Sequence, residues 1–262
     1  MHDERTREVA RLIRDSPRIV VFTGAGISTE SGIPDFRSPG GIWSQYNADD
    51  LTYQRFRSHE KYRKLYWEYD RARFPAMRDA LPNPAHLAIV EIEKTGRMTA
   101  LITQNIDGLH QKAGSSPEKI YELHGTVWEV TCLDCGRRWP REEVTERMDR
   151  QGIDVPYCDE CRGPLKCATI AFGQSLPADA IEQSFFHARN CDLFITVGSS
   201  LVVHPAAMLP AEAKQAGARL VLINMSDTPY DRLMDVIVPG MAGPAMEAVM
   251  AEYRKQSNTR SN

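Results

Sequence analysis

The stretch RIVVFTGAGISTESG, residues 18–32, indicates the fold class of this chain. Its first part is a short apolar run rich in β-branched residues, which is typical of a buried strand. The run ends at a glycine turn, residues 24–26, where the backbone can bend tightly and approach a ligand. Similar nearly continuous apolar runs follow at residues 98–104, 193–197, 219–223 and, more weakly, 236–238. Such runs predict strands covered on both faces, as in a parallel sheet.

Helical patterns alternate with these runs. They lie at residues 4–14, 84–94, 178–188, 205–215 and 244–255. The alternation predicts an α/β fold with a doubly wound parallel (Rossmann-like) sheet, which binds ligands at the carboxyl ends of its strands. Two stretches interrupt the pattern. We therefore expect a sheet domain made of residues 1–32, 84–125 and 172–262 and a helical insertion at 33–83. Residues 126–171 contain two C-x-x-C pairs, so we expect them to form a smaller zinc-binding module.

Composition excludes several classes of protein. The 262 residues carry 32 Lys and Arg against 35 Asp and Glu, a net charge of −3, which argues against a generally basic nucleic-acid binder. No apolar run approaches the roughly 18 residues of a membrane-spanning helix. The charged start of the chain lacks the apolar core of a signal peptide. We therefore expect a cytoplasmic protein whose thiols stay reduced.

Four of the six cysteines form two matched C-x-x-C pairs. They are Cys132 and Cys135, and Cys158 and Cys161. Two such pairs supply the four thiolates of a tetrahedral zinc site, and a filled coordination sphere predicts a structural ion rather than a catalytic one. Two redox dithiols are the alternative, which the matched pairs disfavour. We interpret Cys167 and Cys191 as buried thiols.

The glycine turn predicts a phosphate site, because a helix opening behind it would offer unpaired N–H groups to a pyrophosphate. The full dinucleotide fingerprint is not present, since position 29 is Thr, so a tight strand-to-helix turn without ligand is the alternative. The residues that follow place an acid, an aromatic and a base together. Arg37 could pair with phosphate and Phe36 could cover the reactive face of a cofactor. A solvated Asp–Arg loop is the other interpretation.

Polar residues also follow the later strands. The stretch TQNIDGLH, residues 103–110, has amides and a carboxylate that suit a carboxamide such as nicotinamide and a ribose, or else form an Asx turn that caps the next helix. Residues 198–200 suit phosphate or ribose, Asn224 suits a ribose, and residues 240–243 could line an adenine. Their shared place at strand ends, rather than any one of them, supports a nucleotide site.

His124, followed by a glycine, is a candidate general base because the reference pKa of histidine lies near neutral pH. A structural histidine with one backbone hydrogen bond is the alternative. His110 and His204 are rival candidates, and proximity to two predicted site loops favours His124.

Together these motifs resemble one family. The segments 24–38, 103–110 and 124–125, the two cysteine pairs, and residues 172–173, 198–200 and 223–224 occur in the order of the sirtuins. The resemblance runs from about residue 19 to 243. It implies an NAD-dependent protein-lysine deacylase, most simply a deacetylase, that consumes NAD as co-substrate and carries one structural Zn²⁺. Nicotinamide and an O-acyl-ADP-ribose would be its products.

The resemblance also implies roles for individual residues. The acyl oxygen of the substrate would displace nicotinamide, and His124 would then act as base on a ribose hydroxyl that attacks the resulting imidate. Asn105, with Asp107, would hold the nicotinamide carboxamide, which makes His124 and Asn105 the catalytic residues; Phe36 would shield the intermediate. NAD would contact Gly24, Ala25, Gly26, Ile27, Asp35, Phe36, Arg37, Trp43, Gln104, Asn105, Ile106, Asp107, Gly198, Ser199, Ser200, Asn224, Met225, Ser226 and Ala242.

The implied partners are acyl-lysine proteins or peptides, bound as an added strand along a short segment. That segment consists of Ile170, Ala171, Phe172 and Gly173. We expect a monomer that binds neither nucleic acid nor membrane.

The chain departs from the family pattern in three places. Gln174 stands where Glu is frequent, and His204 stands where Tyr is usual. Tyr69 is followed by Arg71 and Arg73 rather than by Arg at the third position, which disfavours a preference for acidic acyl groups. An ADP-ribosyltransferase or NAD hydrolase is the alternative within the family. A nucleotide-sensing module without chemistry and a dehydrogenase are the alternatives outside it.

Overall fold

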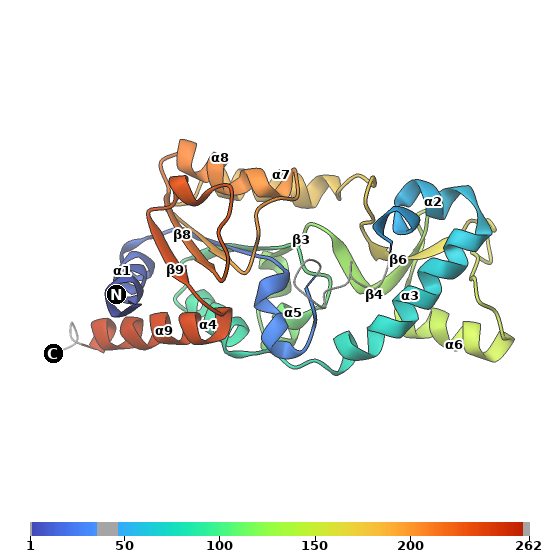
Figure 1. Ribbon diagram of the computed structural model, residues 1–262, viewed down its shortest axis with the longest axis horizontal. Helices are drawn as coiled ribbons and strands as arrows, with labels where there is room; N and C mark the ends of the chain where they lie inside the picture. Colours follow the sequence, from blue (N-terminus) through green and yellow to red (C-terminus); the bar gives the residue numbers. More distant parts are fainter. Residues whose placement is uncertain (1, 36–46, 259–262) are drawn as a thin grey trace.

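The computed structural model describes residues 2–35 and 47–258 (Figure 1). Its main sheet has six strands in the order β3-β2-β1-β7-β8-β9, and each neighbouring pair is parallel. The strands are β1 (Ile19–Thr23), β2 (Met98–Thr103), β3 (Ile120–Glu122), β7 (Leu193–Val197), β8 (Arg219–Asn224) and β9 (Val236–Pro239). The chain runs outward from β1 to one edge, then from β7 to the other. The strand order therefore reverses between β1 and β7, where a sheet of this kind opens a crevice for ligands.

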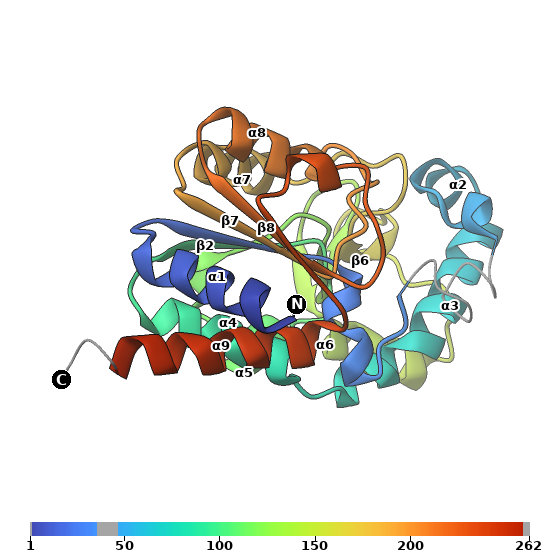
Figure 2. The same ribbon diagram turned by 60° about the vertical axis from the view of Figure 1, so that its left-hand side comes forward.

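Helices cover both faces of this sheet (Figure 2). One face carries α1 (His2–Asp15), α4 (Pro84–Lys94) and α9 (Ala242–Asn258); the other carries α7 (Ala178–Arg189) and α8 (Leu209–Gln215). Ile19 and Val21 of β1 belong to the first core, whereas Val20 and Phe22 belong to the second. The prediction of strands buried on both faces is therefore confirmed.

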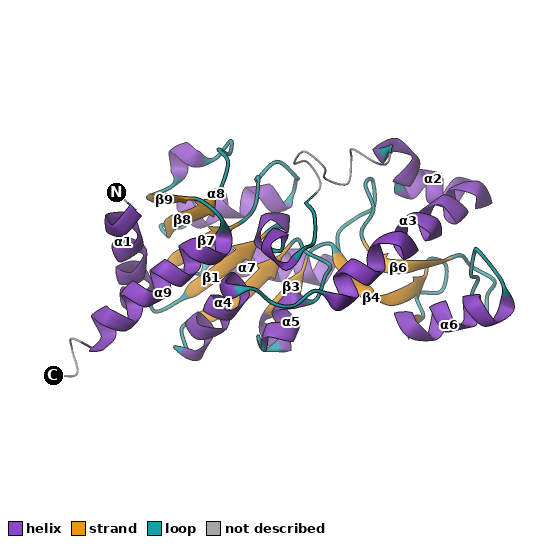
Figure 3. Cartoon of the chain, turned by 60° about the horizontal axis from the view of Figure 1, so that its bottom comes forward, coloured by secondary structure: helices purple, strands orange, loops and turns teal. Residues whose placement is uncertain are grey.

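A second body lies beyond the carboxyl ends of the strands (Figure 3). Its antiparallel sheet, in the order β5-β4-β6, consists of β4 (Gly125–Cys132), β5 (Arg138–Pro140) and β6 (Leu165–Thr169). The helices α2 (Tyr53–Ser58), α3 (Glu60–Asp79) and α6 (Arg141–Gln151) pack around it. Trp67 of α3 is buried, and its Nε1 donates to the Leu165 carbonyl over 3.1 Å. Side chains from the two predicted insertions thus share one core.

The structure corrects two local expectations and adds one strand. The glycine turn opens two short 3₁₀ turns, η1 (Ala25–Ile27) and η2 (Thr29–Ser31), rather than a longer helix. Gly32 ends them in a left-handed conformation with φ of 84°. The pattern at residues 205–215 begins as the 3₁₀ turn η6 (Ala206–Met208) before α8. Strand β3 was not predicted, because its three half-buried residues form no apolar run.

Four connecting elements complete the described residues: the short helix α5 (Leu109–Ala113) and the 3₁₀ turns η4 (Ala48–Leu51), η5 (Pro117–Lys119) and η7 (Asp231–Leu233). Within residues 2–35 and 47–258, every helix is too short or too polar to traverse a lipid bilayer.

Candidate active site

A cavity of about 930 Å³ opens at the carboxyl ends of β1, β2, β7 and β8 and extends to α3 of the second body. Most of the residues predicted to bind NAD or substrate line it. They are Gly24, Ala25, Gly26, Asp35, Gln104, Asn105, Ile106, Asp107, His124, Ile170, Ala171, Phe172, Gly173, Gly198, Ser199, Ser200, Asn224, Met225, Ser226 and Ala242. Ile27 is fully buried beneath the glycine turn and is not among the lining residues. Phe36, Arg37 and Trp43 lie outside the described residues.

The glycine turn packs backbone against backbone on the loop after β7. Gly24 N donates to the Val197 carbonyl over 3.1 Å, and Gly26 N donates to the Gly198 carbonyl over 2.8 Å. A Cβ added at Gly24 would lie 2.8 Å from the Gly198 oxygen. Gly198 has φ of 64°, and a Cβ there would collide with the backbone nitrogen of Ile27. The glycines are therefore required for the close approach of two loops, which leaves backbone surface along the cavity.

The loop after β2 brings three polar side chains together. Asn105 is buried, and its Nδ2 donates to the Gly24 carbonyl over 3.2 Å and to Ser28 Oγ over 3.1 Å. Ser28 Oγ in turn donates to Asp107 Oδ2 over 2.8 Å. Because both amide hydrogens of Asn105 are used, Oδ1 is the atom of this side chain that remains for a ligand. Ser28 was missed in the sequence, where a serine inside a glycine-rich turn carries no distinct signal.

Asp107 combines the two roles that the sequence left open. Its Oδ1 accepts from Leu109 N over 2.9 Å, which is the Asx-type contact at the start of α5. Asp107 is also among the residues that line the cavity. Burial raises the pKa of Asp107, while the hydrogen bonds from Leu109 and Ser28 act in the opposite direction.

His124 is held with one ring nitrogen toward the protein. Its Nδ1 lies 2.9 Å from the Gln104 carbonyl oxygen, which can only accept, so Nδ1 carries the proton. In the neutral ring, Nε2 is then the basic nitrogen. Burial lowers the pKa of His124 below 6.5, which the hydrogen bond to Gln104 partly offsets. The imidazole is therefore neutral at pH 7, the form that a general base requires.

The rival histidines have different surroundings. His110 is fully buried and lies 2.9 Å from Thr23 Oγ1, and it is not among the lining residues of the cavity. His204, which precedes a cis proline, does line the cavity. Gln104, beside His124, is fixed by a 2.8 Å hydrogen bond from its Nε2 to Ser199 Oγ. This contact joins the loops after β2 and β7.

The segment predicted to bind substrate is tied at both ends. Ile170 N donates to the His124 carbonyl over 2.8 Å. At the other end, Phe172 accepts at its carbonyl from Tyr53 N over 2.9 Å, and Gly173 accepts from Gln54 Nε2 over 3.1 Å. The segment thus bridges the loop that carries His124 and α2.

Gln174, one of the departures noted above, closes a turn on this segment. Its Oε1 accepts from Ala171 N over 3.2 Å, and its N donates to the Ala171 carbonyl over 3.0 Å.

One wall of the cavity consists of residues that the sequence did not assign to the site. It is formed by side chains of α3 on one helical face: Tyr66, Tyr69, Asp70, Arg73, Phe74 and Met77. Arg73 stacks its guanidinium 4.6 Å from the centre of the Tyr69 ring and donates to the Tyr69 hydroxyl. Asp70 is buried and forms an ion pair with the buried Arg141. The helical spacing of these residues predicts a buried face, but not that this face borders a ligand cavity.

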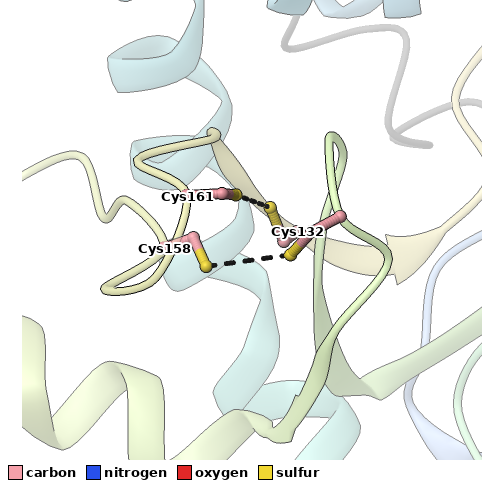
Figure 4. A group of neighbouring side chains, drawn as sticks. Cys132, Cys158 and Cys161 are labelled. Carbon is pink, nitrogen blue, oxygen red and sulfur yellow. Dashed lines mark hydrogen bonds between the residues drawn. The ribbon is translucent and has the colours of Figure 1, made fainter.

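The four cysteines of the two pairs meet in space (Figure 4). Their sulfur atoms all lie within 4.8 Å of one another, with 3.4 Å between Cys132 and Cys161 and 3.9 Å between Cys135 and Cys158. A tetrahedral zinc with Zn–S bonds of about 2.3 Å requires sulfur separations of about 3.8 Å. The cluster therefore fits a zinc ion held by four thiolates. It lies in the second body, and none of the four is among the described residues that line the cavity.

The remaining cysteines are buried, as predicted. Cys167 is fully buried, with its sulfur 3.0 Å from Arg141 Nη1 and 3.4 Å from Asp70 Oδ1. Cys191 packs in the core beneath α7 and α8.

Comparison with known proteins agrees with this geometry. Residues 24–205 match the model described as the Sir2 family. A protein of Rhodopseudomonas palustris named "NAD-dependent protein deacetylase" is 43% identical over 88% of this chain and 90% of its own length. A protein of Archaeoglobus fulgidus named "NAD-dependent protein deacylase 2" is 39% identical over 97% of this chain and 98% of its own length.

A solved structure is similarly close. The structure titled "Sir2-p53 peptide-NAD+" superposes with a TM-score of 0.85 at 37% identity, over 94% of this chain and 97% of that one.

Proposed function

This chain belongs to the Sir2 family, and we propose that it is an NAD-dependent protein-lysine deacylase, with acetyl-lysine as its simplest substrate. The observation that carries the proposal is the tautomer of His124. A neutral imidazole offers its basic Nε2 at a cavity whose other polar walls are the glycine turn and the loop after β2. Relatives that cover most of the chain are named deacetylases or deacylases, which supports this activity over ADP-ribosyl transfer or NAD hydrolysis.

NAD would occupy the part of the cavity next to the main sheet. The glycine turn and residues 198–200 would contact its phosphates, and Asn224 to Ser226 with Ala242 would contact the adenosine half. Asn105 and Asp107 would hold the nicotinamide carboxamide. The position of the glycine turn along the cavity and the remaining Oδ1 of Asn105 support this arrangement.

The acyl-lysine would enter between the main sheet and the second body. We propose that the sheet domain of residues 1–32, 84–125 and 172–262 binds the nucleotide, while the insertions at 33–83 and 126–171 frame the lysine tunnel. The substrate backbone would pair with residues 170–173 as an added strand. The hydrogen bonds that tie this segment to His124 and α2 support its role as a fixed edge.

The proposed reaction uses three side chains of this protein, Asn105 and Asp107 in the first step and His124 in the second. Asn105 and Asp107 orient the carboxamide while the acyl oxygen of the substrate displaces nicotinamide from the ribose. His124 Nε2 then accepts the proton of a ribose hydroxyl, whose oxygen attacks the carbon of the imidate. Loss of the lysine amine and addition of one water molecule at this carbon then leave an O-acyl-ADP-ribose. The four-thiolate zinc would support the fold of the second body and take no part in these steps.

The same proposal covers the wider setting of the protein. We infer a cytoplasmic monomer that acts on acylated proteins or peptides and binds neither nucleic acid nor membrane. Reduced thiols suit a thiolate-bound zinc, and the near-neutral charge suits substrates whose lysine has lost its charge by acylation.

One assay tests the proposal. The protein is incubated with NAD and a panel of acyl-lysine peptides, and nicotinamide release and peptide mass are followed together. We expect nicotinamide to appear in step with loss of the acyl mass from the peptide. Nicotinamide release that does not depend on acyl peptide would indicate a hydrolase or transferase instead. A change in nicotinamide absorbance without release would indicate hydride transfer.

A further inference from the structure

Two histidines outside the cavity form a buried pair behind the glycine turn. His86 lies in α4 and His110 in α5, both are fully buried, and their ring centres are 5.0 Å apart at an interplanar angle of 57°. Neither is among the lining residues of the cavity, and the proposed reaction uses neither. The hydrogen bond of His110 to Thr23 nevertheless leads toward the loop after β2.

The tautomer of His86 follows from its backbone partner. His86 Nδ1 lies 3.3 Å from Asn83 N, a backbone amide that can only donate, so Nδ1 carries the lone pair. The proton of a neutral His86 is then on Nε2. Burial lowers the pKa of His86 to about 4, so the ring is neutral at pH 7.

The tautomer of His110 follows from two threonines. Thr23 Oγ1 donates its single proton to Thr103 Oγ1 over 2.8 Å. In the 2.9 Å contact between Thr23 Oγ1 and His110 Nε2, the histidine must therefore be the donor. Neutral His110 then carries its lone pair on Nδ1. Burial, with a smaller effect of the neighbouring His86, lowers the pKa of His110 well below its usual value.

With these tautomers, each of the two histidines has one ring nitrogen that lacks a hydrogen-bond partner. Within residues 2–35 and 47–258, His86 Nε2 and His110 Nδ1 are both buried and make no hydrogen bond. The first is a donor and the second an acceptor, and they belong to rings in contact. A direct N–H···N bond after a small shift, or one bridging water molecule, would satisfy both at once.

From Thr103, this series of hydrogen bonds continues to Asn105, which lines the cavity. Thr103 Oγ1 accepts from the backbone N of Asn105 over 3.0 Å, and Asn105 Nδ2 donates to the carbonyl of Gly24, the residue after Thr23. The threonines are the last residues of β1 and β2, and they are paired with each other in the sheet. The Thr103 hydroxyl thus holds the backbone of Asn105. Thr103 in turn accepts a hydrogen bond from Thr23, and His110 orients the Thr23 hydroxyl.

We propose that His86 and His110 are positioning residues of the deacylase reaction, acting through Thr23 and Thr103 to fix the Asn105 backbone and amide where nicotinamide binds. This inference rests on the proposed function, because it assigns the reaction that Asn105 serves. The order of donors is His86 to His110 to Thr23 to Thr103. Breaking it frees the Thr103 hydroxyl to rotate and loosens the loop after β2.

A set of threonine variants tests the kinetic claim. Thr23→Val keeps the shape of the side chain but removes the hydroxyl, and Thr23→Ser restores it. Thr196→Val is the matched control, because Thr196 is fully buried in β7 and its Oγ1 has no hydrogen-bond partner among the described residues. We expect Thr23→Val to lower kcat/KM for NAD about tenfold, with KM for the acyl peptide changed less than about twofold. Thr23→Ser should recover most of the loss, and Thr196→Val should behave as the unmodified protein.

Two kinetic outcomes would overturn the proposal. In one, Thr23→Val folds and turns over NAD as fast as the unmodified protein. In the other, Thr196→Val loses as much activity as Thr23→Val, which would make the effect one of general packing.

Nuclear magnetic resonance tests the tautomers without any need for activity. In protein labelled with ¹⁵N-histidine at pH 7, we expect His86 and His110 to be neutral with the proton on Nε2, assigned by comparison with His86→Gln and His110→Gln. A protonated ring, or a proton on Nδ1 of His110, would refute the chain of donors. If the unmodified protein failed to deacylate peptides, the proposed function would be refuted. The resonance measurement would still show whether the hydrogen bonds run from His86 through His110 to the two threonines.

Discussion

His124 is the single residue on which the proposed chemistry depends most directly. Its Nδ1 is committed to the Gln104 carbonyl, so the ring presents Nε2 as the base. We expect His124→Ala to lower peptide deacylation by about 10²- to 10⁴-fold, since that is the usual contribution of a general base. Nicotinamide exchange should persist, because the base is needed only after nicotinamide has left.

Mass spectrometry of the peptide and isotope exchange of labelled nicotinamide measure the two steps separately. His187→Ala is the matched control, because that half-buried histidine hydrogen-bonds to the Tyr121 hydroxyl and is not among the lining residues. Full turnover by His124→Ala would refute the assignment of the base.

The pH dependence follows from the same residue. Burial lowers the pKa of His124 below 6.5, so protonation of the folded protein requires a lower pH than that of a free histidine. His124 therefore stays mostly neutral at pH 6.5. The protein loses activity only as the pH falls through the pKa of His124 in the folded state, which is lower than that of a free histidine. We therefore expect the acidic limb of the pH profile of kcat/KM to lie below 6.5. An acidic limb above 6.5 would contradict the neutral, buried imidazole.

At the scale of elements, the contact between the glycine turn and the loop after β7 shapes the side of the cavity where we propose that NAD binds. A Cβ at Gly198 would both strain a left-handed backbone and collide with Ile27 N. We expect Gly198→Ala to destabilise the fold by about 1–2 kcal/mol from strain and a further 1–3 kcal/mol from overpacking, and to weaken NAD binding.

Gly217→Ala separates these two effects. Gly217 also has a left-handed backbone, with φ of 95°, but a Cβ there would meet nothing within 4 Å. Gly217→Ala should therefore lose stability from backbone strain alone, and its affinity for NAD should be unchanged. Denaturant unfolding and calorimetric titration with NAD compare the two variants, and equal NAD affinities would show that the close approach does not shape the nucleotide site.

The cysteine cluster is the second element whose role can be isolated. Cys158→Ser removes a buried thiolate from the site. We expect it to lose the zinc, about one ion per chain, and to lower the free energy of unfolding by more than about 4 kcal/mol. Cys191→Ser is the control, because Cys191 is buried at a distance from the cluster in another core. Metal analysis and thermal unfolding provide the readouts, and zinc retained by Cys158→Ser would disprove four-thiolate coordination.

At the scale of the whole molecule, one buried ion pair joins the helical and cysteine-bearing parts of the second body. Asp70 of α3 lines the cavity, and Arg141 of α6 pairs with it in the interior. We expect Arg141→Met to destabilise the protein by about 3–5 kcal/mol, because it leaves the buried Asp70 carboxylate without its ion-pair partner. The cavity wall should loosen as well, which would raise KM for the acyl peptide.

Arg138→Met is the matched control. Arg138 pairs with Glu129 over 2.7 Å, but both side chains are exposed, so the loss should not exceed about 1 kcal/mol. The double variant Asp70→Leu with Arg141→Met should be more stable than Arg141→Met alone, since the orphaned charge is gone. Chemical unfolding of the unmodified protein and the three variants measures their free energies of unfolding. Equal losses of stability for Arg141→Met and Arg138→Met would refute the stabilising role of the buried ion pair.

The sequence by itself determined the features that are local or repetitive. The apolar runs determined the central strands, because a strand buried on both faces must be hydrophobic at every position, as Val20 and Val21 illustrate. The spacing of Cys132 and Cys135, and of their later counterparts, determined a metal site, because adjacent thiolates on one turn suit one ion. The polar residues at strand ends indicated the nucleotide side of the cavity.

Only the tertiary structure decided which distant residues cooperate. Ser28 joins Asn105 to Asp107, and His110 reaches Thr23, through contacts between segments about 80 residues apart. The wall of α3 became part of the cavity only when that helix packed on the small sheet. The edge strand β3, with three half-buried residues, likewise acquired its conformation by pairing with β2. The pattern of apolar residues along the sequence indicates which positions are buried. Hydrogen bonds between residues far apart in the sequence depend instead on how the helices and strands pack.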